Sequence, residues 1–122
     1  MSEPRSTRQR ALGVRGEALA ATYLEQQGYR VLERNYRCAL GELDLVVADA
    51  AYVVFVEVKT RQGQAALHPS LSVTRRKQAK VRQLGEHYLT QHPALTLQPR
   101  FDVVAITADG GTEKIEHLPN AF

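Results

Sequence analysis

GELDLVVADAAYVVFVEVKTR, residues 41–61, contains two apolar runs typical of β-strands, ELDLVVA and YVVFVEVKT. Both faces of the second run begin with apolar side chains, so we expect this strand in the middle of a sheet, covered on both sides. Glu57 and Lys59 interrupt its apolar pattern. They therefore mark one end of a buried strand and are not an ordinary solvent-facing row.

The residues between the two runs suit a turn, and we expect the runs to pair as an antiparallel hairpin. With a two-residue turn at residues 50–51, every apolar residue of one run meets an apolar partner. Leu43, Leu45, Val46 and Val47 then lie opposite Val58, Val56, Phe55 and Val54. The same register places Asp44 opposite Glu57, and Glu42 then falls opposite Lys59. A register shifted by two residues is the alternative, in which Asp44 meets Lys59 as a plain ion pair.

Two opposed carboxylates, Asp44 and Glu57, would repel each other across the hairpin, because directly opposed side chains have Cβ atoms roughly 5 Å apart. A divalent cation removes this repulsion. Mg²⁺ and Mn²⁺ accept carboxylate oxygens, keep several waters and can be held by two acidic side chains. The hairpin therefore predicts a Mg²⁺ or Mn²⁺ site at Asp44 and Glu57.

The remaining sequence predicts one α/β domain. The expected elements are a helix over residues 11–27, strands over 29–37, 42–48 and 52–60, a helix over 74–91, and strands over 100–107 and 113–118. Because the second helix joins the third strand to the fourth, a right-handed crossover makes those two strands parallel, whereas the first three form an antiparallel meander. We therefore expect a mixed sheet flanked by helices in a single domain over residues 11–122, preceded by a flexible basic arm over residues 1–10.

Length and composition narrow the class of protein. A chain of 122 residues is enough for one hydrophobic core, and its one cysteine, Cys38, leaves no internal disulfide. No apolar stretch approaches the roughly 18 residues of a membrane helix, and the start, MSEPRSTRQR, lacks the apolar segment of a secretion signal. We therefore expect a cytoplasmic protein with no membrane partner.

The net charge of +3 and the pI near 9.2 favour polyanions only mildly, so the position of the charges matters more. One group lies in or beside the N-terminal arm and comprises Arg5, Arg8, Arg10 and Arg15. A second group lies in the second helix and comprises Arg75, Arg76, Lys77, Lys80 and Arg82. Both groups are suited to contact phosphates, and a disordered arm with a solvated helix face explains them equally well.

The spacing of Gly41-x-x-Asp44, about a dozen further residues and then Glu57-x-Lys59 resembles the active-site pattern of the restriction-endonuclease-like superfamily, the PD-(D/E)xK nucleases. The α-β-β-β-α-β order is similar to the core of that superfamily. Together with RGEALAATYLEQQGYRVLERNYR, RFDVVAI and the terminal NAF, the hairpin resembles the YraN-like family of predicted nucleases, itself akin to archaeal Holliday-junction resolvases. The chain departs from the superfamily pattern in carrying Leu43, and not proline, before the aspartate.

The resemblance implies a restriction-endonuclease-like fold and metal-dependent hydrolysis of phosphodiester bonds in DNA by an endonuclease, with branched or structured DNA among its substrates. It implies that Asp44 and Glu57 bind the metal and that Lys59 orients or activates the attacking water. Glu17 would correspond to the helix glutamate that several resolvases add to the metal shell. Its spacing from Ala20 and Leu24 places it on the helix face toward the sheet, although a surface glutamate fits equally well.

The candidate DNA contacts lie beside this pattern and comprise Arg61, Arg75, Arg76, Lys77, Gln78 and Lys80. Ordinary surface positions are the alternative for each. Two other functions fit the same residues: a non-catalytic nucleic-acid-binding module on this fold and a protein-interaction scaffold. Symmetric cutting of two strands would call for a homodimer, and the polar half of the strand over residues 29–37 offers an edge for it.

Overall fold

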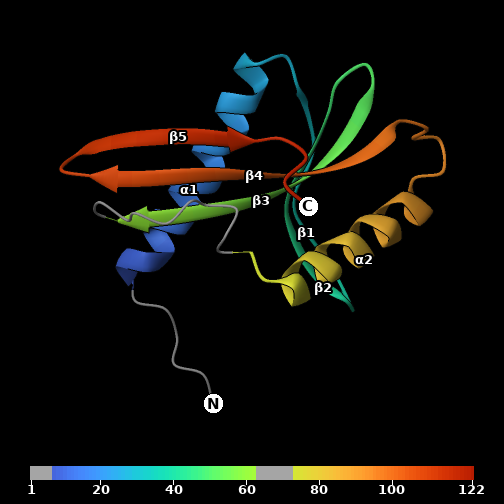
Figure 1. Ribbon diagram of the computed structural model, residues 1–122, viewed down its shortest axis with the longest axis horizontal. Coiled ribbons are helices and arrows are strands. Elements are labelled where there is room, and N and C mark those ends of the chain that lie inside the picture. The colour runs from blue at the N-terminus through green and yellow to red at the C-terminus, as the bar shows by residue number, and fades with distance from the viewer. Residues whose placement is uncertain (1–6, 63–72) are drawn as a thin grey trace.

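The computed structural model describes residues 7–62 and 73–122, with side chains from residue 13 onward in the first range. In chain order its elements are α1 (Thr7–Gln26), β1 (Arg30–Cys38), β2 (Gly41–Ala48), β3 (Tyr52–Gln62), α2 (Arg75–Gln91), β4 (Gln98–Asp109) and β5 (Thr112–Leu118). The predicted order of helix, three strands, helix and two strands is confirmed (Figure 1). No helix in these two ranges is both long and apolar enough to cross a membrane.

The helix α1 begins at Thr7 and not at Ala11, so the last four residues of the predicted flexible arm are helical. Residues 1–6 of that arm lie outside the described part of the chain. The helix ends before Gly28, whose φ of 99° is a left-handed conformation that favours glycine. There the backbone N–H of Tyr29 donates to the carbonyl of Leu24 at 3.0 Å, which satisfies one of the last helical carbonyls.

The five strands form one mixed sheet in the order β1-β2-β3-β4-β5. Neighbours from β1 to β3 are antiparallel, β3 and β4 are parallel, and β5 returns antiparallel to β4. The helix α2 makes the crossover between the parallel strands, as predicted. The coarse expectation of an antiparallel meander plus a parallel strand, flanked by helices, is confirmed.

The two helices cover opposite faces of this sheet (Figure 1). On one face, Ala20, Ala21 and Leu24 of α1 pack against Val54 and Val56. On the other face, α2 packs on the alternate β3 residues through a cluster that comprises Val81, Leu84, Tyr88, Val53 and Phe55. The residues from Val53 to Val56 are all at most 1% exposed, so β3 is the buried central strand that its two-sided apolar pattern predicts.

The hairpin of β2 and β3 has the predicted register over four pairs, and its ladder ends before the predicted pairs of Asp44 with Glu57 and of Glu42 with Lys59. Its pairs are Leu45 with Val56, Val46 with Phe55, Val47 with Val54, and Ala48 with Val53. The carboxylate of Asp49 accepts the backbone N–H groups of Ala51 at 2.9 Å and Tyr52 at 2.7 Å, which fixes the two-residue turn. The alternative that pairs Asp44 with Lys59 is therefore wrong, because it requires a shift of two residues along this ladder.

Gly16 lets α1 lie directly on β3. A Cβ atom at this position would overlap the side-chain methyl of Thr60, so any other residue would force Thr60 or the helix to shift. The contact brings the backbone of α1 next to the second half of β3. Glu17 follows Gly16 in the chain, and its position relative to the sheet is fixed by this close approach.

Candidate active site

The strands β2 and β3 part at the charged residues. β3 pairs with β4 along its whole length, from Tyr52 to Gln62, whereas its pairing with β2 covers only Val53 to Val56. Figure 1 shows β1 and β2 running steeply across the direction of β4 and β5, so that β3 passes from one part of the twisted sheet to the other. The second half of β3 therefore has one side open.

Asp44 lies at the point where the two strands part. Its Oδ2 atom accepts the backbone N–H of Val58 at 2.9 Å, so a side chain of β2 takes a hydrogen bond from the open side of β3. This bond holds the carboxylate of Asp44 against the strand that carries Glu57. The parting of the strands thus opens the side of β3 next to the acids while keeping the acids on neighbouring elements.

Glu57 is the next residue of β3 after the paired segment, and its side chain is 9% exposed. Two ammonium groups approach its Oε1 atom: Lys59 Nζ at 3.6 Å and Lys77 Nζ at 3.7 Å. Lys59 comes from the same face of β3, and Lys77 comes from the first turn of α2. Both distances exceed a normal charge-assisted hydrogen bond, so the lysines compensate Glu57 mainly by charge.

The two carboxyl groups have raised pKa values. Burial raises the pKa of Asp44 most, against the lowering effect of the Val58 N–H and of the Lys77 ammonium. Burial also raises the pKa of Glu57, and the charge of Asp44 raises it further, while Lys77 and Lys59 lower it. The charge of one acid is therefore felt by the other, as the predicted register requires, and an added cation would favour the doubly ionised pair.

A hollow of about 280 Å³ opens at this point, lined by Gly13, Glu17, Asp44, Glu57, Val58, Lys59 and Thr60. It lies between α1 and the parted strands, so Glu17 shares the hollow with the carboxylate pair. With its amide nitrogen turned toward the acids, Asn35 donates to Glu17 Oε2 at 3.0 Å and to Glu42 Oε1 at 3.1 Å. The fold thus brings together the four residues that the sequence predicted for catalysis and metal binding.

These side chains fit one kind of metal site and not another. Within residues 7–62 and 73–122, no three His, Cys, Asp or Glu side chains are arranged as a ready metal cage. A closed structural site, such as a tetrahedral zinc centre, is therefore a poor fit. The oxygens of Asp44 and Glu57 instead suit a hydrated Mg²⁺ or Mn²⁺ ion, which needs only one or two carboxylates beside its waters.

The predicted DNA contacts separate into two groups. Arg75, Arg76 and Lys80 are exposed on α2. Gln78, by contrast, donates its amide to the carbonyl of Val73 at 3.0 Å, so this side chain stabilises the start of α2.

Lys77 turns inward to Glu57. Arg61 is half-buried on β3, and its Nε atom has no hydrogen-bond partner within the described ranges. Of the six predicted DNA contacts, Arg75, Arg76 and Lys80 are therefore the ones exposed to solvent, whereas Arg61, Lys77 and Gln78 are partly buried.

Asn35 is the site residue that the sequence interpretation did not single out. Its φ of 52° interrupts β1 with a left-handed conformation, which asparagine tolerates better than most residues. The sequence feature that could have pointed to Asn35 is an asparagine inside a strand pattern, followed in the next strand by the acids Glu42 and Asp44. That signal is too common in turns and edge strands to identify a site by itself.

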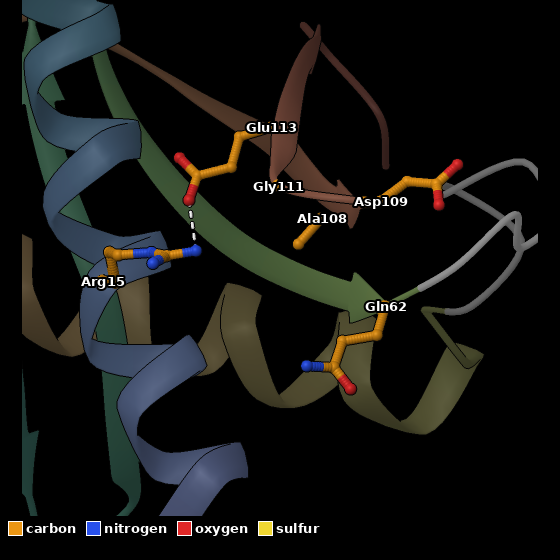
Figure 2. A pocket seen from close by; sticks show the side chains of 7 residues that line it. Arg15, Gln62, Ala108, Asp109, Gly111 and Glu113 are labelled. Atoms are coloured by element: carbon orange, nitrogen blue, oxygen red, sulfur yellow. Dashed lines mark ion pairs between the residues drawn. The ribbon is translucent and has the colours of Figure 1, made fainter.

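A second, larger hollow of about 420 Å³ lies between α1 and the β4–β5 turn. Figure 2 shows Arg15 of α1 reaching toward Glu113 of β5, and the two form an ion pair. Asp109 points away from Glu113 in the same view. The two acids of this larger hollow, Asp109 and Glu113, do not converge on one point, so the smaller hollow remains the candidate active site.

The chain resembles one family along most of its length. The model of the uncharacterised protein family UPF0102 matches residues 16–106, a range that contains Glu17, Asp44, Glu57 and Lys59. A UPF0102 protein of Geobacter metallireducens is 45% identical over 117 residues, which is 96% of this chain and 96% of the relative. Another, from Beutenbergia cavernae, is 47% identical over 109 residues, covering 88% of this chain and 92% of the relative.

Proposed function

The chain belongs to the uncharacterised protein family UPF0102, and from its carboxylate pair we propose that it is a metal-dependent nuclease that hydrolyses phosphodiester bonds in DNA. One observation carries the proposal: Asp44 and Glu57 come from neighbouring strands, share one hollow and have raised pKa values. We also propose that the mixed sheet is of the restriction-endonuclease-like type. Two features support this fold type: the acids lie on the antiparallel strands β2 and β3, and the basic helix α2 follows β3.

Asp44 and Glu57 would hold Mg²⁺ or Mn²⁺ in this proposal, and Glu17, which lines the same hollow, is the candidate for a third carboxylate near the ion. When bound, such an ion lowers the pKa of a coordinated water and neutralises charge on the phosphate. The hydrogen bond from Val58 keeps Asp44 in place, so this one of the two proposed ligands is oriented before an ion arrives.

Lys59 acts on the attacking water or on the reacting phosphate in this proposal. It follows Glu57 by two residues on the same strand face, and its side chain is 27% exposed at the edge of the hollow. From there its ammonium group donates to the attacking water or to a phosphate oxygen and compensates the charge that develops there.

The exposed Arg75, Arg76 and Lys80 of α2 bind the flanking phosphates, and Arg61 of β3 is a further candidate contact. Because phosphate contacts of this kind carry no base specificity, DNA shape selects the substrate, with branched or structured DNA as candidates. A homodimer joined through β1, an outer strand of the sheet, would cut two DNA strands symmetrically.

The alternative is a non-catalytic nucleic-acid-binding module. One observation favours it: Lys59 and Lys77 already compensate Glu57, so the acid pair is tolerable without an ion. In that case the basic residues of α2 bind nucleic acid and the carboxylates have only a structural role.

The full chain, incubated with Mn²⁺ or Mg²⁺ and with labelled linear, single-stranded, flapped and four-way DNA, separates these functions. We expect metal-dependent products that Glu57→Gln abolishes, whereas Glu116→Gln, an exposed acid of β5, keeps full activity. Salt-sensitive binding without cutting, equal in both variants, would leave only the binding module. The absence of any salt-sensitive DNA affinity would contradict both functions and favour a protein-interaction scaffold.

A further inference from the structure

Lys77 has a position that simple phosphate binding does not require. Its backbone N–H donates to the side-chain oxygen of Thr74 at 3.1 Å, which fixes the start of α2. Its ammonium group, by contrast, lies 3.7 Å from Oε1 of Glu57, and its side chain is 42% exposed. The base of this residue is therefore anchored, while its long side chain borders solvent and has room to turn away.

Two ammonium groups approach one oxygen of Glu57 before any metal binds. Lys59 Nζ lies 3.6 Å and Lys77 Nζ 3.7 Å from its Oε1 atom. A divalent cation that coordinated this carboxylate would lie beside two positive charges and would repel both of them. We expect one ammonium group to give way.

Lys77 is better placed to leave than Lys59. Lys59 belongs to the central strand, where it pairs with Ala105 of β4, and its side chain is 27% exposed against 42% for Lys77. Lys77 also neighbours Arg75 and Arg76, so a released ammonium group joins a basic surface on α2. Its exit thus moves a positive charge from the metal site to the side where DNA phosphates would lie.

We propose that Lys77 is a displaceable counter-ion: its ammonium group occupies Glu57 until a divalent cation replaces it, and it then becomes available to a substrate phosphate. This inference rests on the proposed function, because it concerns the same metal site. Its consequence is coupling. Since binding free energies are reciprocal, DNA that takes up the ammonium group strengthens metal binding, and metal strengthens DNA binding.

Calorimetric titration of the full chain with Mn²⁺ alone tests the counter-ion. It is carried out at pH 8 for every variant, because the raised pKa values of Asp44 and Glu57 favour their protonated forms at lower pH. We expect Lys77→Met to bind Mn²⁺ roughly tenfold more tightly than the wild type, the order expected for removal of a half-exposed unit charge beside the ion. Lys80→Met removes the same charge from the exposed face of α2 and should leave the affinity unchanged.

A second measurement follows the ammonium group directly. In protein with ¹⁵N-labelled lysines, saturating Mg²⁺ should shift the Nζ signal of Lys77 and leave that of Lys80 in place. A purely structural lysine would show neither this shift nor the gain in Mn²⁺ affinity of Lys77→Met.

The outcomes separate the two proposals. If the wild type binds Mn²⁺ through Asp44 and Glu57 but Lys77→Met binds no more tightly, or if Mg²⁺ leaves the Lys77 signal unmoved, the counter-ion is excluded and the metal site stands. If neither the wild type nor Lys77→Met takes up Mn²⁺, both proposals fail. Thermal unfolding of both methionine variants checks that they are folded.

Discussion

Two buried acidic centres in this protein have opposite electrostatic character. Asp102 of β4 is 0% exposed, yet hydrogen bonds from His117 and Arg100 outweigh its burial and lower its pKa. The carboxyls of Asp44 and Glu57 are also largely buried, but their pKa values are raised. Burial alone therefore does not distinguish the two centres.

The difference lies in the hydrogen-bond donors. Asp102 accepts from Arg100 Nε at 2.9 Å, Arg100 Nη2 at 2.8 Å, His117 Nε2 at 2.7 Å and the Asn120 N–H at 2.9 Å. Asp44 has the Val58 N–H, and the cations near Glu57 are 3.6 and 3.7 Å away. An acid with a full set of hydrogen-bond donors stabilises the fold, whereas an acid with few close donors retains the capacity to bind a cation.

The largest expected effect is on stability at Asp102. Asp102→Asn should lower the free energy of unfolding by about 3 kcal/mol or more, because it leaves the Arg100 guanidinium buried without its counter-charge. Urea unfolding measures the change, and exposed Asp109→Asn serves as the control. A loss below about 1 kcal/mol would show that Asp102 is no more important than an ordinary polar residue.

Next in size is the loss of activity at the other centre. Glu57→Gln should reduce metal-dependent DNA cleavage at least about 100-fold, because it removes one of two proposed metal ligands. The same variant should not lose stability, since it also removes a buried charge whose pKa is raised. Cleavage assays and urea unfolding of the same preparation test both statements. A marked loss of stability would show that Glu57, like Asp102, mainly stabilises the fold.

The pH dependence of stability should separate the centres without DNA or metal. Asp102 has a lowered pKa, so its contribution is present above the unfolded value of about 4 and is lost as pH falls through the folded pKa. Asp44 and Glu57 have raised pKa values, so their contribution is present below the unfolded values and is lost as pH rises through the folded ones.

Unfolding measured from pH 3 to pH 8 follows both trends. Relative to the wild type, the double variant Asp44→Asn with Glu57→Gln should gain stability as pH rises, whereas the deficit of Asp102→Asn should shrink as pH falls. Parallel curves for all three proteins would contradict the assigned pKa directions.

The smallest expected effect concerns Asn35. Asn35→Ala loses both the amide and the left-handed conformation, and it should cost about 1 kcal/mol more stability than Asn35→Gly, which keeps the backbone free to adopt positive φ. Both variants should weaken Mn²⁺ binding by a similar factor if the amide positions Glu17. Calorimetry measures the effect on Mn²⁺ binding and urea unfolding measures the effect on stability. Unchanged Mn²⁺ affinity in both variants would show that Asn35 matters only for the backbone conformation of β1.

The sequence predicted the hairpin because its information is local. Apolar residues in ELDLVVA and YVVFVEVKT match in one register, and the ladder in that register ends one residue before Asp44 and Glu57. The cap of α2 is local as well, since Thr74 precedes the helix and its side chain accepts from Lys77. The predicted fold order and the closeness of Asp44 and Glu57 follow from such short-range signals, whereas Glu17 was expected beside them from the family resemblance.

The Asp102 cluster was not predictable in this way. The residues of this cluster come from places far apart in the chain. Arg100 donates a hydrogen bond to the hydroxyl of Tyr29 at 2.7 Å, and His117, which bonds Asp102, belongs to β5. No pattern within RFDVVAI shows that its aspartate is saturated by donors. The inward turn of Lys77 and the capping role of Gln78 likewise depend on side-chain positions that periodicity does not determine.

The close approach at Gly16 has a consequence for the proposed metal ion. The helix lies on Thr60 with no room for a side chain, so its backbone helps to set how far Glu17 stands from Asp44 and Glu57 across the hollow. A methyl group added there would have to displace Thr60 or the helix, and a displaced helix would widen the hollow without altering any carboxylate. If the proposed ion is held there, the preference between a small and a larger divalent ion would then depend on a residue that contacts neither ion.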